Sequence, residues 1–406
     1  MNINDEITVS ILNLDDYGRG VAHIENYTIF VPNALANETV KIRITNLKSH
    51  LAEGEVVEYV SRSLKRLEPD CPFFNECGGC SLRHMSYEDS LKFKKDKVRH
   101  AIYKFAHLDE DLVQDIISDE NMYYRNKVEF QVNGKIGFYK KKSNKVVPIE
   151  ECKLADTRIN DVLKAIKHPE GLNSLTIKAS KYTNDLMVIA TGAIDPEDLK
   201  TLKSLATSIY LNDKDIFGND VIYEKLGDFV YTISPSSFFQ VNTDMALKLY
   251  NGIKEKLEPK KDDKVFDLYC GTGTIGIYIA SDVKEVRGIE INADSIKDAI
   301  ENASINNVEN ISFITGSVNK QLMKEEFKAN KIIVDPPRTG LDADTIEYLN
   351  KSKAERIVYV SCDPITLSRD INLLKEYKVE SITPYDVFPY SYHVETISVL
   401  NLRDKH

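Results

Sequence analysis

The chain lacks any long apolar run. None of its hydrophobic stretches approaches the roughly 20 residues that a helix needs to cross a bilayer, and its start, MNINDEITVS, is too polar and acidic for a secretory signal. These absences argue against a membrane-spanning or exported class. They predict a cytoplasmic protein without membrane contact.

An excess of positive charge is also missing. The chain has 53 Lys and Arg against 63 Asp and Glu, a formal net charge of −10, which argues mildly against a nucleic-acid partner because phosphate binding depends on Lys and Arg. The charge is segregated, however. Residues 41–145 hold 20 basic against 16 acidic side chains, with basic runs at 92–100 (KFKKDKVRH) and 139–145 (YKKKSNK). Each run is consistent with a solvated helix face or with an RNA-binding surface.

Cysteines are few, six in 406 residues. A chain of this size without a signal sequence is expected in a reducing compartment, where disulfides are rare. Metal ligands or nucleophiles are therefore better first assignments for the cysteines than disulfide partners.

Three segments differ in their patterns. Residues 1–65 alternate β-branched residues between Gly, Asn and Asp turns, which predicts a small OB-like β-barrel. Residues 66–237 combine an amphipathic helix at 86–106 with a hairpin turning at Asn-Gly, and read as an α+β domain. In residues 238–406, apolar strands alternate with helical segments, which predicts an α/β domain built on a parallel, doubly wound sheet.

A glycine loop lies in the last of these segments. Strand KVFDLY runs into a GxGxxG loop at 271–276, and Glu290 ends the next strand. Glycines let a ligand approach the backbone, and the acid can accept hydrogen bonds from ribose hydroxyls. This spacing alone does not separate a dehydrogenase from a methyltransferase. Asp267 before the loop and the sequence DPPR at 335–338 favour the methyltransferase.

A cysteine and a carboxylate are candidates for covalent chemistry. Cys362 follows the fifth strand, where a nucleophile is expected, although a cysteine there is also compatible with simple packing. One reaction that needs a nucleophile of this kind is methylation at carbon 5 of uracil, because this carbon is a poor nucleophile until a thiolate adds to carbon 6. Such a site should lower the thiol pKa from about 8.5 or pass the proton to a base. Glu395 is the candidate base for the proton on carbon 5, and His393 is a weaker one.

An ordered set of motifs carries a family resemblance. FQVN, DLYCGTGTIG, DPPRTG, SCDP and FPYSYHVE together resemble the RNA uracil-5-methyltransferases that act on 23S ribosomal RNA and on tRNA, and the first segment resembles their TRAM domain. The resemblance covers nearly the whole chain. It implies a class I methyltransferase fold, S-adenosylmethionine as donor, Cys362 as nucleophile and Glu395 as base. The donor contacts that it implies are Gln240, Tyr269, Glu290 and Asp335.

The remaining cysteines suggest a metal site. Cys71, Cys77 and Cys80 form C-x5-C-G-G-C, with Cys152 as a distant fourth thiolate. Four thiolates suit zinc or an iron–sulfur cluster, and three close cysteines with a remote one are more typical of [4Fe–4S]. The pattern is similar to the cluster-bearing ribosomal branch of the family, so the resemblance implies 23S ribosomal RNA as substrate. Cys270, in the glycine loop, is expected to pack.

RNA contacts are expected on the barrel, on the basic run 92–100 and at Arg125 with Lys127, with Tyr124 or Phe130 stacking on bases. No obligate protein partner is inferred. Three other functions stay open: an RNA cytosine-5 methyltransferase, a tRNA uracil-5 methyltransferase, and a non-catalytic iron–sulfur protein that binds RNA.

Overall fold

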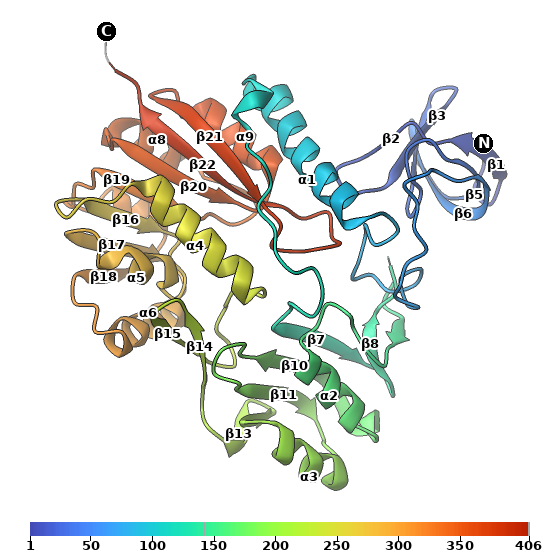
Figure 1. The fold of residues 1–406 in the computed structure, drawn as a ribbon, viewed down its shortest axis with the longest axis horizontal. Coiled ribbons are helices and arrows are strands. Elements are labelled where there is room, and N and C mark those ends of the chain that lie inside the picture. The colour runs from blue at the N-terminus through green and yellow to red at the C-terminus, as the bar shows by residue number, and fades with distance from the viewer. Residues whose placement is uncertain (142, 405–406) are drawn as a thin grey trace. The chain divides into compact units, whose positions relative to one another are not determined.

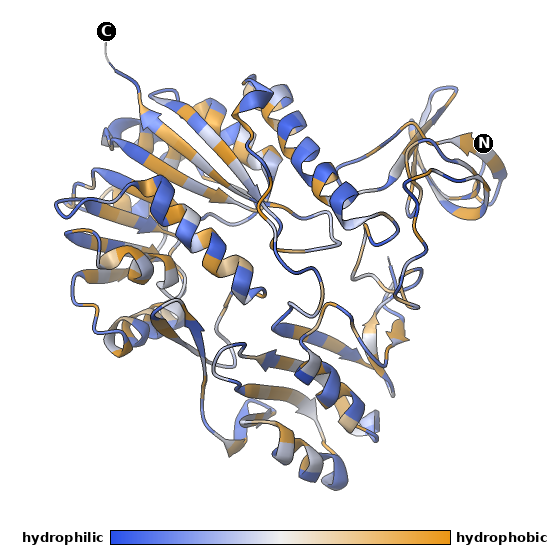
Figure 2. Ribbon diagram, in the orientation of Figure 1, coloured by the Kyte–Doolittle hydropathy of each residue, from blue (hydrophilic) through white to orange (hydrophobic). Residues whose placement is uncertain are grey.

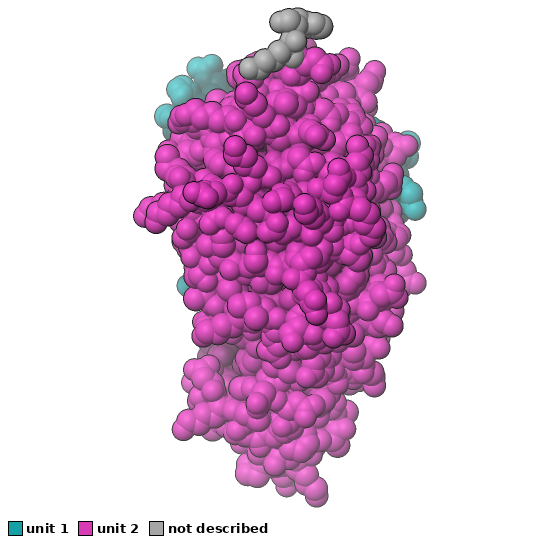
Figure 3. Space-filling model, turned by 90° about the vertical axis from the view of Figure 1, so that its left-hand side faces the viewer, with its two compact units in different colours: residues 1–94, 138–149, 388–392 teal, residues 95–137, 150–387, 393–406 magenta. Residues whose placement is uncertain are grey.

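The structure, a computed structural model, describes residues 1–141 and 143–404. The chain forms two compact units (Figure 3). Unit 1 comprises Met1–Lys94, Phe138–Ile149 and Phe388–Tyr392; unit 2 comprises Lys95–Gly137, Glu150–Val387 and His393–His406. Each contains segments that are distant in the sequence, so neither is a continuous stretch of chain. The predicted division into residues 1–65, 66–237 and 238–406 stays a prediction.

Unit 1 contains a six-stranded sheet in the order β1-β5-β6-β4-β3-β2 (Figure 1). The strands are β1 Glu6–Ser10, β2 Asn13–Leu14, β3 Gly20–Ile24, β4 Tyr27–Val31, β5 Thr39–Leu47 and β6 Leu51–Ser61. In β5, buried Val40, Ile42 and Ile44 alternate with more exposed residues, as expected for a strand with one face on a core. β1 also contacts β3, although three strands separate them in the order. The sheet therefore curls on itself, as the sequence predicted.

A second sheet has the order β13-β12-β11-β10-β7-β8-β9. Its strands are β7 Lys127–Val132, β8 Ile136–Tyr139, β9 Val146–Pro148, β10 Leu172–Ala179, β11 Leu186–Gly192, β12 Ser208–Leu211 and β13 Lys214–Gly218. The predicted Asn-Gly hairpin is confirmed, since β7 pairs antiparallel with β8 and Gly134 takes a φ of 63°. A separate hairpin, β14 Ile222–Leu226 and β15 Phe229–Ile233, follows it along the chain.

The third sheet has the order β18-β17-β16-β19-β20-β22-β21. Its strands are β16 Lys264–Leu268, β17 Glu285–Glu290, β18 Ile311–Thr315, β19 Lys331–Val334, β20 Arg356–Ser361, β21 Tyr377–Tyr385 and β22 Glu395–Leu402. The first five in this order are parallel, which confirms the predicted α/β fold. β22 runs antiparallel to both β20 and β21. Its first residue therefore lies at the edge where the parallel strands end.

Nine α-helices accompany the sheets in the described part of the chain. They are α1 Tyr87–Ala101, α2 Thr157–Ala165, α3 Pro196–Leu205, α4 Thr243–Leu257, α5 Thr274–Ala280, α6 Ala293–Ile305, α7 Val318–Leu322, α8 Ala343–Ser352 and α9 Pro364–Leu373. A π-helical turn, Ile102–Ala106, continues α1. α4 alternates hydrophobic and hydrophilic residues (Figure 2) and buries Leu249, Ile253 and Leu257 on one face. No helix in the described residues is long and apolar enough to span a membrane.

One fully buried side chain, Asn302 on α6, connects that helix to strand β15 and to the glycine loop. Its Oδ1 accepts hydrogen bonds from the backbone N–H and the hydroxyl of Thr232, both at 2.8 Å, and its Nδ2 donates to the carbonyl of Thr272 at 3.2 Å. An apolar side chain at this position would leave these buried groups without partners.

We expect Asn302→Ala to lower the free energy of unfolding by about 2 to 4 kcal/mol, because several buried polar groups lose their partner at once. Urea unfolding followed by circular dichroism would measure this. The control is Ser304→Ala, an exposed position on the same helix, which should change stability by under about 0.5 kcal/mol. Equal effects of the two variants would show that the Asn302 network contributes little.

Candidate active site

The candidate site lies where the strands of the third sheet end. Asp335 follows β19 and Cys362 follows β20, while Glu395 begins the antiparallel β22. Ser361 pairs with Thr396 across β20 and β22, so the register continues with Cys362 beside Glu395. Ligands of open α/β sheets bind at this edge because the loops diverge there. The structure thus brings together residues that are 60 positions apart in sequence.

The turn after β20 fixes the position of Cys362. Asp363 caps α9, its carboxylate accepting hydrogen bonds from the N–H groups of Ile365 at 2.8 Å and Thr366 at 3.1 Å. Pro364 occupies the first helical position, where a missing N–H costs nothing. Cys362 is therefore held between the last strand residue and a capped helix, and its side chain is half-buried.

The electrostatics of the pair differ from the expectation. The pKa of Cys362 is raised to about 11, chiefly by burial and next by the Glu395 carboxylate, while Arg338 acts in the opposite direction. A lowered thiol pKa was one of the two predicted routes to a thiolate, and it is wrong for this structure. The reason is physical: a half-buried thiol beside carboxylates loses more solvation than one cation restores. Proton transfer to a base is the route that remains.

Glu395 is buried, with 8% of its surface exposed. Its pKa is raised to about 8, chiefly by burial and next by Asp335, while Arg338 acts in the opposite direction. Arg338 belongs to the DPPR motif, yet sequence reasoning assigned it no role of its own. Its effect on both Cys362 and Glu395 marks it as the cation of the site. A carboxyl group with a pKa near neutrality is suited to act as a general base.

The glycine loop forms the other half of the site. Gly271 has a φ of 53°, and a Cβ built on it would meet no atom within 4 Å, so the loop is open on that side. Its N–H donates to a Glu290 oxygen at 3.2 Å. Gly273, the N-cap residue of α5, has a φ of 75°, and a side chain there would meet Phe313 at 2.8 Å. Backbone amides and a carboxylate at a helix start fit a nucleoside.

Asp267, at the end of β16, is a further carboxylate of this half. One of its oxygens accepts from the N–H of Gly276 at 2.9 Å, while the other, Oδ1, has no hydrogen-bond partner among the described residues. Burial raises its pKa to about 7, and Asp335 and Glu290 contribute to the rise. Burial alone raises the pKa of Asp335 to about 7. A cationic ligand would relieve this crowding of carboxylates.

S-adenosylmethionine suits these carboxylates and backbone amides, since it carries an ammonium, a sulfonium and a ribose. Glu290 fits the ribose role, and the pair Asp267 and Asp335 fits a cation. Tyr269, between β16 and the glycine loop, forms a side-chain hydrogen bond with Thr345. Gln240 lies between β15 and α4, and its backbone carbonyl accepts from the side chain of Asn126 at 2.9 Å.

The structure does not support the predicted metal site. Cys71, Cys77 and Cys80 all belong to unit 1. Within residues 1–141 and 143–404, no three Cys, His, Asp or Glu side chains are grouped as metal ligands. The surroundings of two thiols suit negative charge nonetheless: Cys77 and Cys80 both raise the pKa of Lys141, against the larger lowering by burial.

The structure contradicts one prediction about RNA contacts and removes one lysine from another. Tyr124 and Phe130 are buried, 8% and 1% exposed, and so cannot stack on bases in this conformation. In the basic run 92–100, Lys94 is fully buried and donates to the carbonyl of Phe388 at 2.8 Å. Phe238, which is 66% exposed and lies two residues before Gln240, is an aromatic side chain that sequence reasoning missed.

Two other cations of the same region are paired with acids. Lys95 lies 2.6 Å from Asp115, and Arg99 lies 3.0 Å from Glu110. The run is therefore less available to phosphates than its sequence suggests.

Comparison with known proteins agrees with this geometry. Residues 204–403 match the family model for tRNA (uracil-5-)-methyltransferase, and residues 2–57 match the TRAM domain. An uncharacterized RNA methyltransferase of Clostridium tetani is 34% identical over 98% of this chain and 96% of its own. Another, from Oceanobacillus iheyensis, is 34% identical over 99% of this chain and 98% of its own.

A solved structure is similar over its full length. The Pyrococcus abyssi tRNA (uracil-54, C5)-methyltransferase, in complex with S-adenosyl-L-homocysteine, has a TM-score of 0.80 and 29% identity, covering 97% of this chain and 99% of that one. The relatives, the matched domains and the shared fold agree with the motifs in the sequence. The chain belongs to the RNA uracil-5-methyltransferase family, with an N-terminal TRAM domain.

Proposed function

We propose that this protein methylates carbon 5 of a uridine in 23S ribosomal RNA, with S-adenosylmethionine as the methyl donor. The observation that carries the chemistry is the neighbourhood of Cys362 and Glu395 at the strand ends, with Asp335 and Arg338 beside them. These four groups can supply a nucleophile, a base and the charges that tune both.

The nucleophilic step belongs to Cys362. Its sulfur forms a bond to carbon 6 of uracil, and the electrons of the ring double bond move toward the carbonyl at carbon 4, which makes carbon 5 nucleophilic. The thiol proton has to leave as the bond forms, and the Glu395 carboxylate accepts it and passes it to water before the later proton transfer. Arg338 favours this loss because it lowers the pKa of the thiol. When bound, the donor supplies a methyl group and leaves as a neutral thioether.

Glu395 completes the cycle. Its carboxylate takes the proton from carbon 5, the ring double bond re-forms, and the bond between carbon 6 and Cys362 breaks. The burial that raises the pKa of Glu395 also makes the carboxylate a stronger base than one in water. Asp335, Glu290, Gln240 and Tyr269 are the proposed contacts to the donor.

The RNA substrate rests on the cysteine pattern. The arrangement of Cys71, Cys77, Cys80 and Cys152 in sequence resembles the ribosomal branch, so we infer 23S ribosomal RNA. A second candidate is tRNA, because the similar Pyrococcus enzyme acts on tRNA. Competition between a 23S transcript and a tRNA transcript for methyl incorporation separates the two. Methylation confined to tRNA would reject the ribosomal assignment.

The covalent step predicts a trapped adduct. Wild-type protein with S-adenosylmethionine and RNA that contains 5-fluorouridine should form a stable complex through Cys362. Fluorine replaces the hydrogen at carbon 5 that the base would remove, so the bond to Cys362 cannot break. Mass spectrometry of the digested complex measures it. Cys362→Ala should form none. Glu395→Gln should accumulate the adduct on ordinary RNA, with turnover reduced at least ~100-fold. Methyl found on cytosine, without an adduct, would refute the assigned chemistry.

The raised pKa of Glu395 predicts a pH profile. The base acts in its ionised form, so kcat/KM should rise with pH through about 8. Arg338 lowers the pKa of both Cys362 and Glu395, so Arg338→Met should move the rising limb to higher pH, whereas Arg338→Lys should largely preserve it. Methyl-transfer rates between pH 6 and 9.5 test this. Identical profiles for wild type and Arg338→Met would exclude this role.

The inferred [4Fe–4S] cluster, which we derive from the cysteine spacing, predicts bound iron. Anaerobically purified protein should contain iron and acid-labile sulfide in nearly equal amounts and a broad absorbance in the visible range. Cys80→Ser should lose both, and Cys270→Ser, at the buried cysteine of the glycine loop, should retain them. Zinc in place of iron, or no metal in wild type, would contradict the inference.

A further inference from the structure

The segment that carries Gln240 has no regular pattern of backbone hydrogen bonds. Residues 234–240, between β15 and α4, form neither strand nor helix. Phe238 in the middle of the segment points its ring to solvent, with 66% of its surface exposed, while Phe239 is buried at 7%. A segment of this kind needs partners from elsewhere to keep one conformation, because its backbone carbonyls are not satisfied by regular structure.

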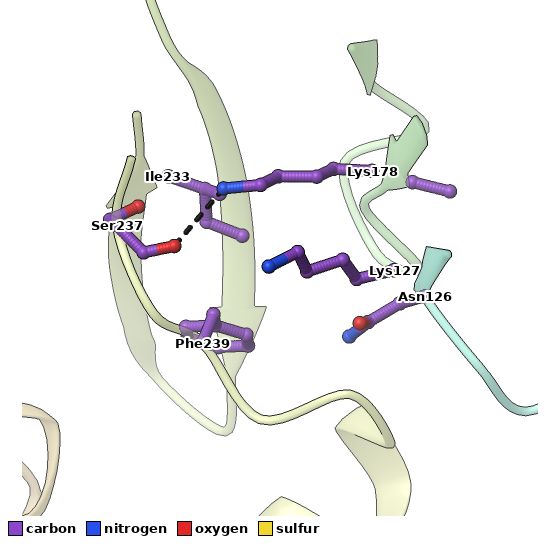
Figure 4. A pocket seen from close by; sticks show the side chains of 7 residues that line it. Asn126, Lys127, Lys178, Ile233, Ser237 and Phe239 are labelled. Atoms are coloured by element: carbon purple, nitrogen blue, oxygen red, sulfur yellow. Dashed lines mark hydrogen bonds between the residues drawn. The ribbon is translucent and has the colours of Figure 1, made fainter. Parts of the chain in front are cut away.

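Lys178 on β10 supplies three of these partners. Its ammonium donates to the carbonyls of Ser234 at 2.8 Å, Pro235 at 3.0 Å and Ser237 at 3.0 Å. In Figure 4 the Lys178 side chain reaches across the pocket to the strand and loop that carry Ile233 and Ser237. An ammonium has three N–H donors. All of them are used on this segment.

Asn126, just before β7, holds the other end. Its Nδ2 donates to the carbonyl of Gln240 and to the hydroxyl of Thr243, both at 2.9 Å. Its backbone N–H donates to the carbonyl of Val241, also at 2.9 Å. β7 and β10 are neighbours in the second sheet. Side chains on β10 and just before β7 therefore bind the segment on either side of Phe238.

The burial of Lys178 is costly, which makes the arrangement informative. The side chain is only 3% exposed, and this burial lowers its pKa to about 8, with a contribution from Lys127. Buried ammonium groups are retained where their hydrogen bonds are satisfied. A neutral apolar residue would fill the same space without the desolvation cost, but it would leave three converging carbonyls without a donor.

We propose that Lys178 is a positioning residue for the methyl donor: with Asn126, it sets the backbone of residues 234–241 and so presents Gln240 to the donor. The inference rests on the proposed function, in which Gln240 contacts S-adenosylmethionine. It assigns part of the donor site to the second sheet, outside the α/β fold that holds the glycine loop. Donor affinity therefore depends on a strand that contributes no atom to the chemistry.

The test is the dissociation constant for S-adenosylhomocysteine, measured by calorimetry on the full chain. Lys178→Met and Asn126→Ala should each weaken binding by at least about tenfold, and Lys178→Arg should recover part of the loss. In steady-state assays Lys178→Met should raise the KM for S-adenosylmethionine while the KM for RNA stays near the wild-type value. A purely structural defect would instead reduce the active fraction and leave both KM values unchanged.

The matched control is Lys331→Met. Lys331 is equally buried, at 4%, donates to the carbonyl of Glu258 and lies 2.8 Å from Asp263, but it begins β19 at the end opposite Asp335. This variant should lose thermal stability and keep the wild-type affinity.

Gln240→Ala separates failure of the inference from failure of the proposed function. Weak binding by Gln240→Ala together with wild-type binding by Lys178→Met and Asn126→Ala would overturn the role of Lys178. Wild-type binding by Gln240→Ala would overturn the donor contact itself. Should Lys178→Met yield too little folded protein, the Asn126→Ala result decides.

Discussion

Several buried carboxyl groups lie at one edge of the third sheet. Their burial disfavours the ionised form, and this electrostatic cost determines the properties of the site. Asp267, Asp335 and Glu395 each have a pKa raised into the range of about 7 to 8. Each keeps its place because the strands that carry it are fixed by their ladders. Since Asp335 acts on the pKa of both Asp267 and Glu395, a change of charge beside it alters the donor half and the reaction half together.

A further buried carboxylate holds the loop after Arg338 and the strand before Cys362. Asp370 on α9 accepts from the N–H of Leu341 and from the hydroxyl of Tyr359, at 2.8 and 2.7 Å. Leu341 follows the DPPR motif and Tyr359 belongs to the strand before Cys362. Asp370 thus connects the cation and the nucleophile through one side chain. Together with Lys178 and Asn126, it shows that buried polar groups help to fix the loops of this site.

Motifs and periodicity predicted many elements of this chain correctly because they depend on local rules. The five parallel strands, helix α4 and the Asn-Gly hairpin follow from apolar runs, amphipathic spacing and turn chemistry. RNA contacts did not follow in the same way. Tyr124 and Phe130 were expected on a surface, but strand alternation and packing bury both. Lys94 lies in a basic run, yet it faces inward, since one helix face must pack.

By itself the sequence determined the α/β class, the order of the motifs and the residues able to take part in a reaction, because strand patterning and the glycine loop are local. Only the tertiary structure decided that Cys362 meets Glu395, since the pairing depends on the antiparallel return of β22. It also decided that the thiol pKa rises, that Arg338 lowers the pKa of both groups, and that Lys178 spans from one sheet to a loop before α4. These are long-range consequences of burial and register, which no local spacing encodes.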